Sequence, residues 1–223
     1  MKHTAERLHD HVVLCGYGAT GRAAVQELLL QGAPAEQIVV IANSEPSLRD
    51  AVEFGVVAVM GDATHESVLQ SVAIERAAHV LILPGRDDTA VLIALTVRDL
   101  NPQVHLVAMC HEAENVKLLV RAGVQTVITP SVAGGNLMAA STRREHLVET
   151  LQDFLSVSGA MRLDERPARR DEAGKAPQDL DGISLVRVYR GEGHFDAPNL
   201  PVIEQGDILV YIASGQARAV HGA

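Results

Sequence analysis

Short runs of aliphatic residues alternate with amphipathic segments along the first 130 residues of the chain. The apolar runs are nearly continuous in Val, Ile and Leu, which is typical of parallel strands buried on both faces of a sheet. Six strands are predicted, at His11–Cys15, Gln37–Ala42, Val56–Met60, His79–Leu83, Val104–Met109 and Val124–Thr129. Five helices are predicted between them, at Thr20–Gln31, Glu45–Phe54, Glu66–Val72, Asp87–Leu100 and Ala113–Ala122. This alternation over residues 11–130 predicts an α/β fold with a doubly wound parallel sheet.

The pattern becomes helical after the sixth predicted strand. Thr129 suits an N-cap and Pro130 suits the first position of a helix. Apolar residues with helical spacing continue to about Ser156, so residues 131–158 are predicted to be a helical region. Gly134-Gly135 near its start favours a bend or a close helix contact, with a pivot as the functional alternative.

The last part of the chain differs in composition from the rest. Residues 159–179 are rich in Pro, Gly, Arg and acidic residues, which predicts a flexible linker. Residues 180–223 predict a small α+β subdomain that is mostly β, with a turn at Gln205-Gly206-Asp207. Its strands are predicted at Ser184–Tyr189, Val202–Ile203 and Ile208–Ala213. A module of this size buries little core by itself.

Composition and charge exclude several classes of protein. The 223 residues carry a net charge of −9, which disfavours DNA or RNA as a partner. With three Phe, three Tyr and no Trp, the chain also lacks stacking platforms for single-stranded nucleic acid. Two Cys form no disulfide framework, so a reducing cytosol is the expected compartment. No apolar stretch of about 18 residues is present, so no membrane-spanning helix is predicted.

The most informative motif is the glycine loop Gly16-Tyr17-Gly18-Ala19-Thr20-Gly21. It lies between a buried strand and a helix, which is the context that a Rossmann-like phosphate-binding loop requires. Gly16 permits a tight turn, Gly18 lets the backbone approach a phosphate, and Gly21 allows close packing of helix against sheet. The N–H groups at the helix start offer an anion site, and Arg22 adds a charged donor. The alternative is a loop that binds nothing.

The identity of the nucleotide stays open. The second predicted strand ends at Ala42, where the common acidic partner of a ribose hydroxyl is missing, although Asn43 and Ser44 could reach a ribose. Asp62, in Gly61-Asp62-Ala63-Thr64, either caps the next helix or faces the nucleotide. We therefore expect an adenine nucleotide, with ATP, ADP and NAD(H) as alternatives. The predicted binding residues are Gly16, Tyr17, Gly18, Ala19, Thr20, Gly21, Arg22, Asn43, Ser44, Asp62, Ala63, Thr64 and Leu83.

Together these segments resemble the RCK domain, the regulator of potassium conductance, which is also called the KTN or TrkA-type domain. The matching segments are His11–Gly18, Gly61–Thr64, Ala122–Val124, Val127–Pro130 and Gln205–Leu209. They span nearly the whole chain, and their combination is far more specific than the glycine loop alone.

The resemblance implies a regulatory role in potassium transport. Domains of this family pair through the helix after the sixth strand and assemble as an octameric ring beneath a pore. The opening Leu8–Val13 looks like the join after the inner helix of a channel, so residues 1–10 are predicted to link to an upstream segment. We expect a homo-oligomeric gating domain at the cytoplasmic face of the membrane, with the membrane part in another segment or subunit. The alternative within the family is a peripheral subunit of a Trk or Ktr transporter.

Two departures from the family pattern affect the expected ligands. Calcium-gated relatives carry carboxylates at the ends of the fourth and fifth strands, where this chain has Leu83-Pro84 and Met109-Cys110-His111. Those residues are poor ligands for a hard cation, so we expect no calcium site there. Cys110 and His111 favour packing in the crevice over a site for a softer metal. In addition, residues 159–179 replace the first strand that is expected in the C-terminal subdomain.

Two other classes of protein share the dinucleotide fold. An NAD(P)-dependent oxidoreductase needs a proton donor beside the nicotinamide, and the ten His residues show no catalytic spacing. His79 and His105 open their predicted strands, at the edge of the sheet opposite the crevice. A DNA-binding sensor needs a basic helix-turn-helix segment, whereas the basic stretch Arg162–Lys175 is interleaved with acids. We therefore predict a regulator and not an enzyme.

Overall fold

The computed structural model describes residues 8–156, 159 and 161–214. Residues 1–7 of the predicted upstream linker lie outside the described residues, as do 157–158 and 160 and, at the C-terminus, 215–223. The chain divides into two compact units, residues 1–139 and 140–223, and each is described by itself. None of the helices within the described residues is long and apolar enough to cross a lipid bilayer.

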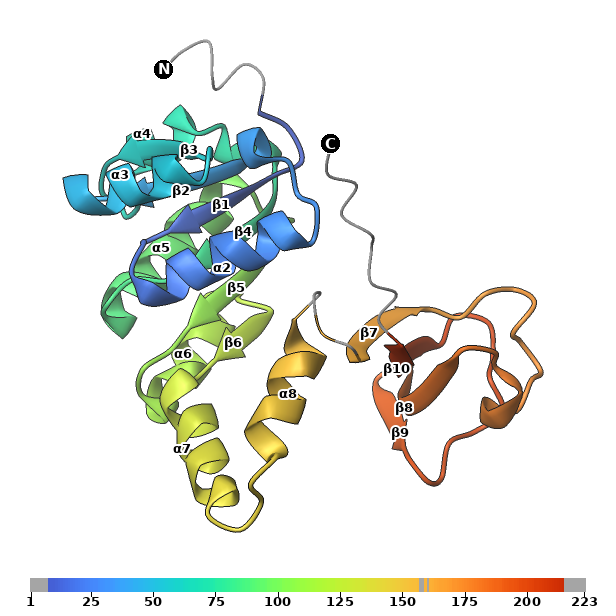
Figure 1. Cartoon of the computed structure of the whole chain (residues 1–223). Helices are drawn as coiled ribbons and strands as arrows, with labels where there is room; N and C mark the ends of the chain where they lie inside the picture. Colours follow the sequence, from blue (N-terminus) through green and yellow to red (C-terminus); the bar gives the residue numbers. More distant parts are fainter. Residues whose placement is uncertain (1–7, 157–158, 160, 215–223) are drawn as a thin grey trace, which may run out of the picture. The chain divides into compact units, whose positions relative to one another are not determined.

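The first unit contains one parallel six-stranded sheet (Figure 1). Its strands are β1 (His11–Cys15), β2 (Ile38–Ala42), β3 (Val57–Met60), β4 (Ala77–Ile82), β5 (His105–Met109) and β6 (Thr126–Ile128). They lie in the order β3-β2-β1-β4-β5-β6 and are all parallel to their neighbours. The predicted doubly wound sheet is confirmed, with strand ends shifted by a few residues.

Helices cover both faces of this sheet. They are α2 (Ala19–Leu30), α3 (Glu45–Glu53), α4 (Glu66–Ser71), α5 (Asp87–Leu100) and α6 (Val116–Arg121), with short 3₁₀ turns at Ala35–Gln37, Ile74–Arg76 and Ala113–Asn115. One buried cluster contains Leu14, Val25 and Ala51, so α2 and α3 pack on one face. The other contains Leu69, Ile93 and Leu119, so α4, α5 and α6 pack on the opposite face. Both clusters are mainly aliphatic, as the scarcity of aromatic residues predicts, and Tyr17 is the aromatic member of the first.

Strand β1 lies at the centre of the sheet, where the direction of winding reverses. Its two neighbours are β2 and β4, whose following helices lie on opposite faces. The backbone continues this pairing beyond the strands, because Gly16 N donates to Ile41 O (2.9 Å) and Leu83 N donates to Cys15 O (2.8 Å). The loops after β1 and β4 are therefore side by side at the carboxyl edge, where open α/β sheets bind ligands.

The helical region after β6 is two helices rather than one. Helix α7 (Pro130–Ser141) begins where the sequence predicts, and α8 (Leu147–Leu155) follows after residues 142–146. Helix α7 continues without a break through Gly134-Gly135, where the sequence favoured a bend or a close helix contact. The break falls instead in the charged segment Thr142-Arg143-Arg144-Glu145-His146, which has no apolar face to bury. The division between the two units falls within α7.

The second unit contains an antiparallel four-stranded sheet. Its strands are β7 (Met161–Pro167), β8 (Ile183–Arg190), β9 (Gly193–Asp196) and β10 (Ile208–Ser214), in the order β7-β10-β8-β9, with a 3₁₀ turn at Pro177–Asp179. Its buried core is small and consists of Leu180, Val188, Ile203, Leu209 and Tyr211. The predicted small α+β module is confirmed, although its strands differ from the predicted ones.

Two predictions for the C-terminal part are wrong, and one strand was not predicted. The predicted flexible linker 159–179 contains β7, which supplies the strand that the sequence suggested was missing. The pair Val202–Ile203 is not a strand, although Ile203 is fully buried and hydrogen-bonds to Gly174 and Lys175. Strand β9 was not predicted, and its short hairpin with β8 turns through Gly191, which has a φ of +57°.

Ion pairs explain why β7 has the composition of a linker. Arg166 donates both terminal nitrogens to Glu172 (2.7 and 2.5 Å), and its guanidinium lies over the Tyr211 ring. The hydrogen bond from Arg166 lowers the pKa of Glu172 to about 2. Charged side chains therefore occupy the half-buried positions of this edge strand, and Pro167 is tolerated at its end.

Candidate functional site

A cleft of about 570 Å³ lies in the first unit at the carboxyl ends of β1, β2 and β4. This volume is within the range of sites that hold small molecules. The residues that line it are Cys15, Gly16, Tyr17, Gly18, Ala19, Thr20, Gly21, Ile41, Ala42, Asn43, Ser47, Gly61, Asp62, Ala63, Leu83, Pro84, Gly85, Arg86, Thr89, Ile93 and Met109. The cleft therefore lies where the strand order reverses, as the doubly wound topology predicts.

The glycine loop adopts a conformation that requires glycine at its first position. Gly16 has a φ of +102°, and a Cβ there would lie 2.6 Å from Leu83 O. At Gly21 a Cβ would lie 3.1 Å from Gly16 O, so this residue sits close against the loop. A Cβ at Gly18, by contrast, would meet no atom within 4 Å, because this residue faces open space. Gly16 thus shapes the loop, and Gly18 leaves room for a ligand beside the backbone.

Gly18 is also the N-cap residue of α2, and no side chain caps this helix end. The first N–H groups of a helix have no partner within the helix and carry a partial positive charge. Among the described residues that line the cleft, only Asp62 and Arg86 are charged, so the wall beside α2 offers backbone donors without carboxylates. The arrangement suits a phosphate group.

The opposite wall comes from the ends of β2 and β3. Asn43 and Ser47 line the cleft, whereas Ser44 does not and occupies the N-cap position of α3. Asp62 and Ala63 line the cleft, but Thr64 lies outside it. The Thr64 backbone amide and hydroxyl both donate to Asp62 Oδ1, at 2.9 and 2.7 Å, and these bonds lower the pKa of Asp62.

The alternative role of Asp62 as a helix cap is wrong. Helix α4 begins at Glu66 and its N-cap residue is His65, which makes no side-chain capping bond. Asp62 instead closes a turn onto Thr64, two residues ahead. This turn holds the carboxylate at the cleft, and Thr64 contributes by positioning it.

Arg22 points away from the cleft that it was predicted to serve. It contacts Asp50 Oδ1 at 3.4 Å, and its guanidinium lies over the Phe54 ring. Tyr17 lines the cleft, but its hydroxyl donates to Asp50 Oδ2 (2.8 Å). Burial and this hydrogen bond raise the pKa of Tyr17 above its usual value. Arg22 of α2 and Tyr17 of the preceding loop thus both contact Asp50 of α3.

The sequence analysis missed the loop after β4, apart from Leu83. Pro84, Gly85, Arg86 and Thr89 line the cleft, together with Cys15, Ile41, Ala42, Ser47, Gly61, Ile93 and Met109. The expected strand order could have identified this loop. In a doubly wound sheet the direction of winding reverses between two neighbouring strands, and the loops that follow these two strands border the crevice. Burial raises the pKa of Cys15 to about 12, so its thiol stays protonated and unreactive.

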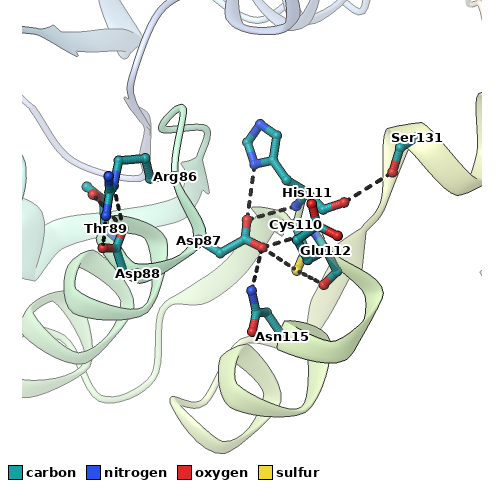
Figure 2. Close-up of polar contacts among 9 residues, drawn as sticks. All are labelled: Arg86, Asp87, Asp88, Thr89, Cys110, His111, Glu112, Asn115 and Ser131. Atoms are coloured by element: carbon teal, nitrogen blue, oxygen red, sulfur yellow. Dashed lines mark hydrogen bonds and ion pairs between the residues drawn. The ribbon is translucent and has the colours of Figure 1, made fainter.

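Arg86 is the only cation among the described residues that line the cleft. Its Nε and Nη2 donate to Asp88 Oδ1 and Oδ2, at 3.0 and 2.5 Å, and this pair lies at the start of α5 (Figure 2). Thr89, which also lines the cleft, donates its backbone N–H to Asp88 Oδ1 at 2.7 Å. The hydrogen bond from Arg86 lowers the pKa of Asp88 to about 2, so the pair is ionised at neutral pH.

Asp87 points in the opposite direction, toward the end of β5 (Figure 2). It accepts hydrogen bonds from the backbone N–H of His111 (2.8 Å) and Glu112 (3.0 Å) and from Asn115 Nδ2 (2.9 Å). His111 Nδ1 lies 3.0 Å from the same carboxylate. Although burial opposes ionisation, these bonds hold the pKa of Asp87 well below its usual range. Asp87 therefore ties α5 to the segment after β5.

Cys110 packs beside this carboxylate. Its Sγ lies 3.6 Å from Asp87 Oδ2 and 3.1 Å from Glu112 O, and burial raises the pKa of its thiol. Within the described residues, no cluster of three or more His, Cys, Asp or Glu side chains has the geometry to hold a metal ion. The side chains of Cys110 and His111 both lie beside the Asp87 carboxylate and do not line the cleft, whereas packing in the crevice was expected.

Comparison with known proteins places this geometry in context. The model of the TrkA-N domain family matches residues 12–130. Over 218 residues, the chain is 24% identical to potassium channel protein 1 of Methanocaldococcus jannaschii, covering 94% of this chain and 65% of that protein. It is 27% identical over 209 residues to Ktr system potassium uptake protein C of Bacillus subtilis, covering 89% of this chain and 90% of that protein.

Among solved structures, the GsuK channel bound to NAD matches with a TM-score of 0.54 and 25% sequence identity. The match covers 92% of this chain and 36% of the GsuK chain. The chain thus spans less than two thirds of the Methanocaldococcus channel protein and about a third of GsuK.

Proposed function

The chain belongs to the TrkA-N domain family, and from this premise we propose that it is a regulatory domain of a potassium channel that binds an adenine nucleotide. The nucleotide would occupy the cleft at the ends of β1, β2 and β4, with its phosphates at the glycine loop. Binding would change the arrangement of paired domains at the cytoplasmic face of the membrane and so open or close the pore.

One observation carries the nucleotide proposal. The uncapped N-terminus of α2 opens into the cleft beside Gly18, where no atom would meet an added Cβ. The backbone can therefore approach a phosphate closely, which only a residue without a side chain allows. A structural neighbour, the GsuK channel, has been solved bound to NAD, which supports the same class of ligand here.

Calorimetric titration with ATP, ADP and NAD(H) tests this proposal. We expect wild-type protein to bind at least one of these nucleotides and Gly18→Asp to lose at least about tenfold in affinity, because its carboxylate would face the phosphate. Gly18→Ser is the matched control for size, and it should retain more affinity than the aspartate variant. No heat with any nucleotide, or Gly18→Asp behaving as wild type, would sink the proposal.

The contacts after β5 offer a physical route from the cleft to α7. Asp87 follows Arg86 of the cleft wall and holds the backbone at His111 and Glu112. His111 O in turn accepts a hydrogen bond from Ser131 Oγ (3.2 Å), in the first turn of α7 (Figure 2). A nucleotide that moves the start of α5 would therefore also act on α7, to the extent that it binds the two arrangements with different affinity.

We propose that α7 pairs with α7 of a second copy of the chain. The helix is mostly apolar, yet none of its residues is buried, and the side chains of Val132 and Met138 are 46% and 76% exposed. An apolar surface of this kind in a monomer marks an interaction site. The relatives are potassium channel and uptake proteins, and in this family such pairs would build the predicted octameric ring.

Light scattering on purified protein tests the assembly. Wild type should be at least dimeric at micromolar concentration, and Met138→Lys should shift it toward monomer, because the ammonium would be buried at the interface. Gln103→Lys, which adds the same charge at an exposed loop position, should keep the wild-type mass. A strictly monomeric wild-type protein, or the same assembly in both variants, would contradict the pairing through α7.

A peripheral Ktr-type subunit is the second candidate, because the chain covers 90% of the Ktr protein of Bacillus subtilis. The residues encoded upstream of Met1 discriminate between the two. Apolar spans that flank a potassium selectivity filter in the same reading frame would establish the channel. A separate gene for the membrane protein, together with its co-purification with this chain, would establish the transporter subunit.

An oxidoreductase is the least favoured alternative. Of the described residues that line the cleft, none is His or Lys, and the one Tyr is already hydrogen-bonded to Asp50. His is the side chain that most often serves as a general acid or base. The geometry of the cleft therefore supports binding of a nucleotide as a regulatory ligand.

A further inference from the structure

We propose that Arg86 is the phosphate-charge selector of the cleft, and that Asp88 competes with the bound nucleotide for it. The inference rests on the proposed function, because it concerns which nucleotides the same cleft prefers. Arg86 would make the cleft prefer nucleotides with a highly charged terminal phosphate group, such as a nucleoside triphosphate. A dinucleotide, whose phosphates lie in its interior, would bind less tightly.

The first argument is the place of Arg86 in the cleft. It lines the same cavity as the glycine loop, and the backbone that leads to it packs directly on that loop, because Leu83 O lies against Gly16. It is also the only cation among the described lining residues, since Arg22 is turned toward Asp50 and Phe54. A phosphate chain that extends from the glycine loop therefore has one side chain able to neutralise it.

The second argument is that Arg86 already has an anionic partner. Its planar guanidinium presents two donors to the two carboxylate oxygens of Asp88, which is the geometry in which arginine also binds phosphate. The Arg86 side chain is 76% exposed, so water screens this pair and exchange to another anion is accessible. A ligand must nevertheless displace one carboxylate charge, and a terminal phosphate with a higher charge does this better than an internal diester.

The third argument is that the exchange requires no unfolding of the helix start. Asp87, between the two partners, is nearly buried and is tied to His111, Glu112 and Asn115 on the other side of the helix start (Figure 2). Asp87 therefore holds the first turn of α5 against the segment after β5, while the side chains of Arg86 and Asp88 are exposed to solvent. Because this turn keeps its hydrogen bonds, Arg86 can exchange its partner by side-chain rotation without unfolding of the helix start, which keeps the cost of recruiting it small.

The experiment compares affinities for ATP and NAD across a double-mutant cycle of Arg86→Gln and Asp88→Asn in the full chain. We expect wild type to favour ATP, and Arg86→Gln to lower the ATP affinity about tenfold or more while changing NAD little. Asp88→Asn should raise the affinity for ATP several-fold, because Arg86 no longer has to break its ion pair with Asp88. In the Arg86→Gln background, the same Asp88→Asn change should have little effect.

This cycle separates competition for Arg86 from a general effect of charge. If Asp88→Asn raises the affinity for ATP equally with and without Arg86, the Asp88 carboxylate acts only through its charge. The proposed exchange of partners at Arg86 is then wrong. If Arg86→Gln binds ATP as wild type does, Arg86 is not the selector. Either result leaves the proposed function intact as long as wild type binds a nucleotide, whereas absence of binding by wild type contradicts the proposed function itself.

Inorganic tripolyphosphate provides a second probe that carries no adenine or ribose. It should compete with ATP in wild type and should compete much less well in Arg86→Gln. Raising the ionic strength should narrow the preference for ATP over NAD, because the contact is exposed to solvent. Equal competition by tripolyphosphate in both proteins would overturn the assignment.

Discussion

Replacing Gly16 by alanine is expected to destabilise the first unit by about 3–5 kcal/mol and to abolish nucleotide binding. The new Cβ would lie 2.6 Å from Leu83 O and 2.8 Å from Leu83 C, which are backbone atoms with little freedom to move. The φ of +102° is itself unfavourable for any residue with a side chain. The loops after β1 and β4 would separate, and both line the cleft.

Gly18→Ala is the matched control for this variant. Its Cβ would meet nothing within 4 Å, and its φ of −118° suits any residue, so we expect a loss of stability below about 1 kcal/mol. Urea denaturation of both variants measures the difference. Equal stabilities would show that the tight contact between Gly16 and Leu83 does not determine the loop, and the account of the cleft would be wrong.

Asp87→Ala is expected to cost about 3–5 kcal/mol at pH 7, because it leaves several donors without an acceptor in a buried place. Those donors are the backbone amides of His111 and Glu112 and the side-chain amide of Asn115. The neighbouring Asp88→Ala removes an exposed carboxylate that pairs with Arg86, and it should leave the unfolding midpoint unchanged within error. Urea denaturation of the two variants gives the comparison.

The effect of Asp87 should also depend on pH in a defined direction. Hydrogen bonds hold the pKa of Asp87 below its unfolded value of about 3.9. The stabilisation is therefore complete above that unfolded value and is lost as the pH falls through the lower folded value. The difference in unfolding free energy between wild type and Asp87→Ala should shrink from pH 7 to pH 3. A difference that stays constant over this range would contradict the role of the ionised carboxylate.

The fold of the first unit was predictable because its strands are short, nearly continuous aliphatic runs separated by amphipathic segments. Continuous runs such as Ile38–Ala42 have no exposed side, so composition alone identifies them. The C-terminal unit was less predictable because its core is small and its strands carry charges. In β7, Arg162 and Arg166 form ion pairs with Asp164 and Glu172, which gives the strand the composition of a linker.

The candidate site was predictable where function depends on backbone geometry. Gly16 and Gly18 form a motif whose spacing carries a physical requirement, and the structure shows that requirement at Gly16. Arg22 does not line the cleft, because its guanidinium lies beside Asp50 and Phe54, and the sequence does not show this neighbourhood. Arg86 was missed because its proximity to the glycine loop arises from β4 lying next to β1, which is a property of strand order.

Hydrogen–deuterium exchange with and without saturating nucleotide tests the central claim, that a ligand in the cleft acts on α7. The account predicts that nucleotide changes exchange at residues 82–90, 111–115 and 130–141 of the wild-type protein and leaves Gly18→Asp unchanged. Residues 82–90 border the cleft, so a change there reports occupancy. The claim would be contradicted if calorimetry shows that nucleotide binds and the exchange rate changes at residues 82–90 but not at residues 130–141.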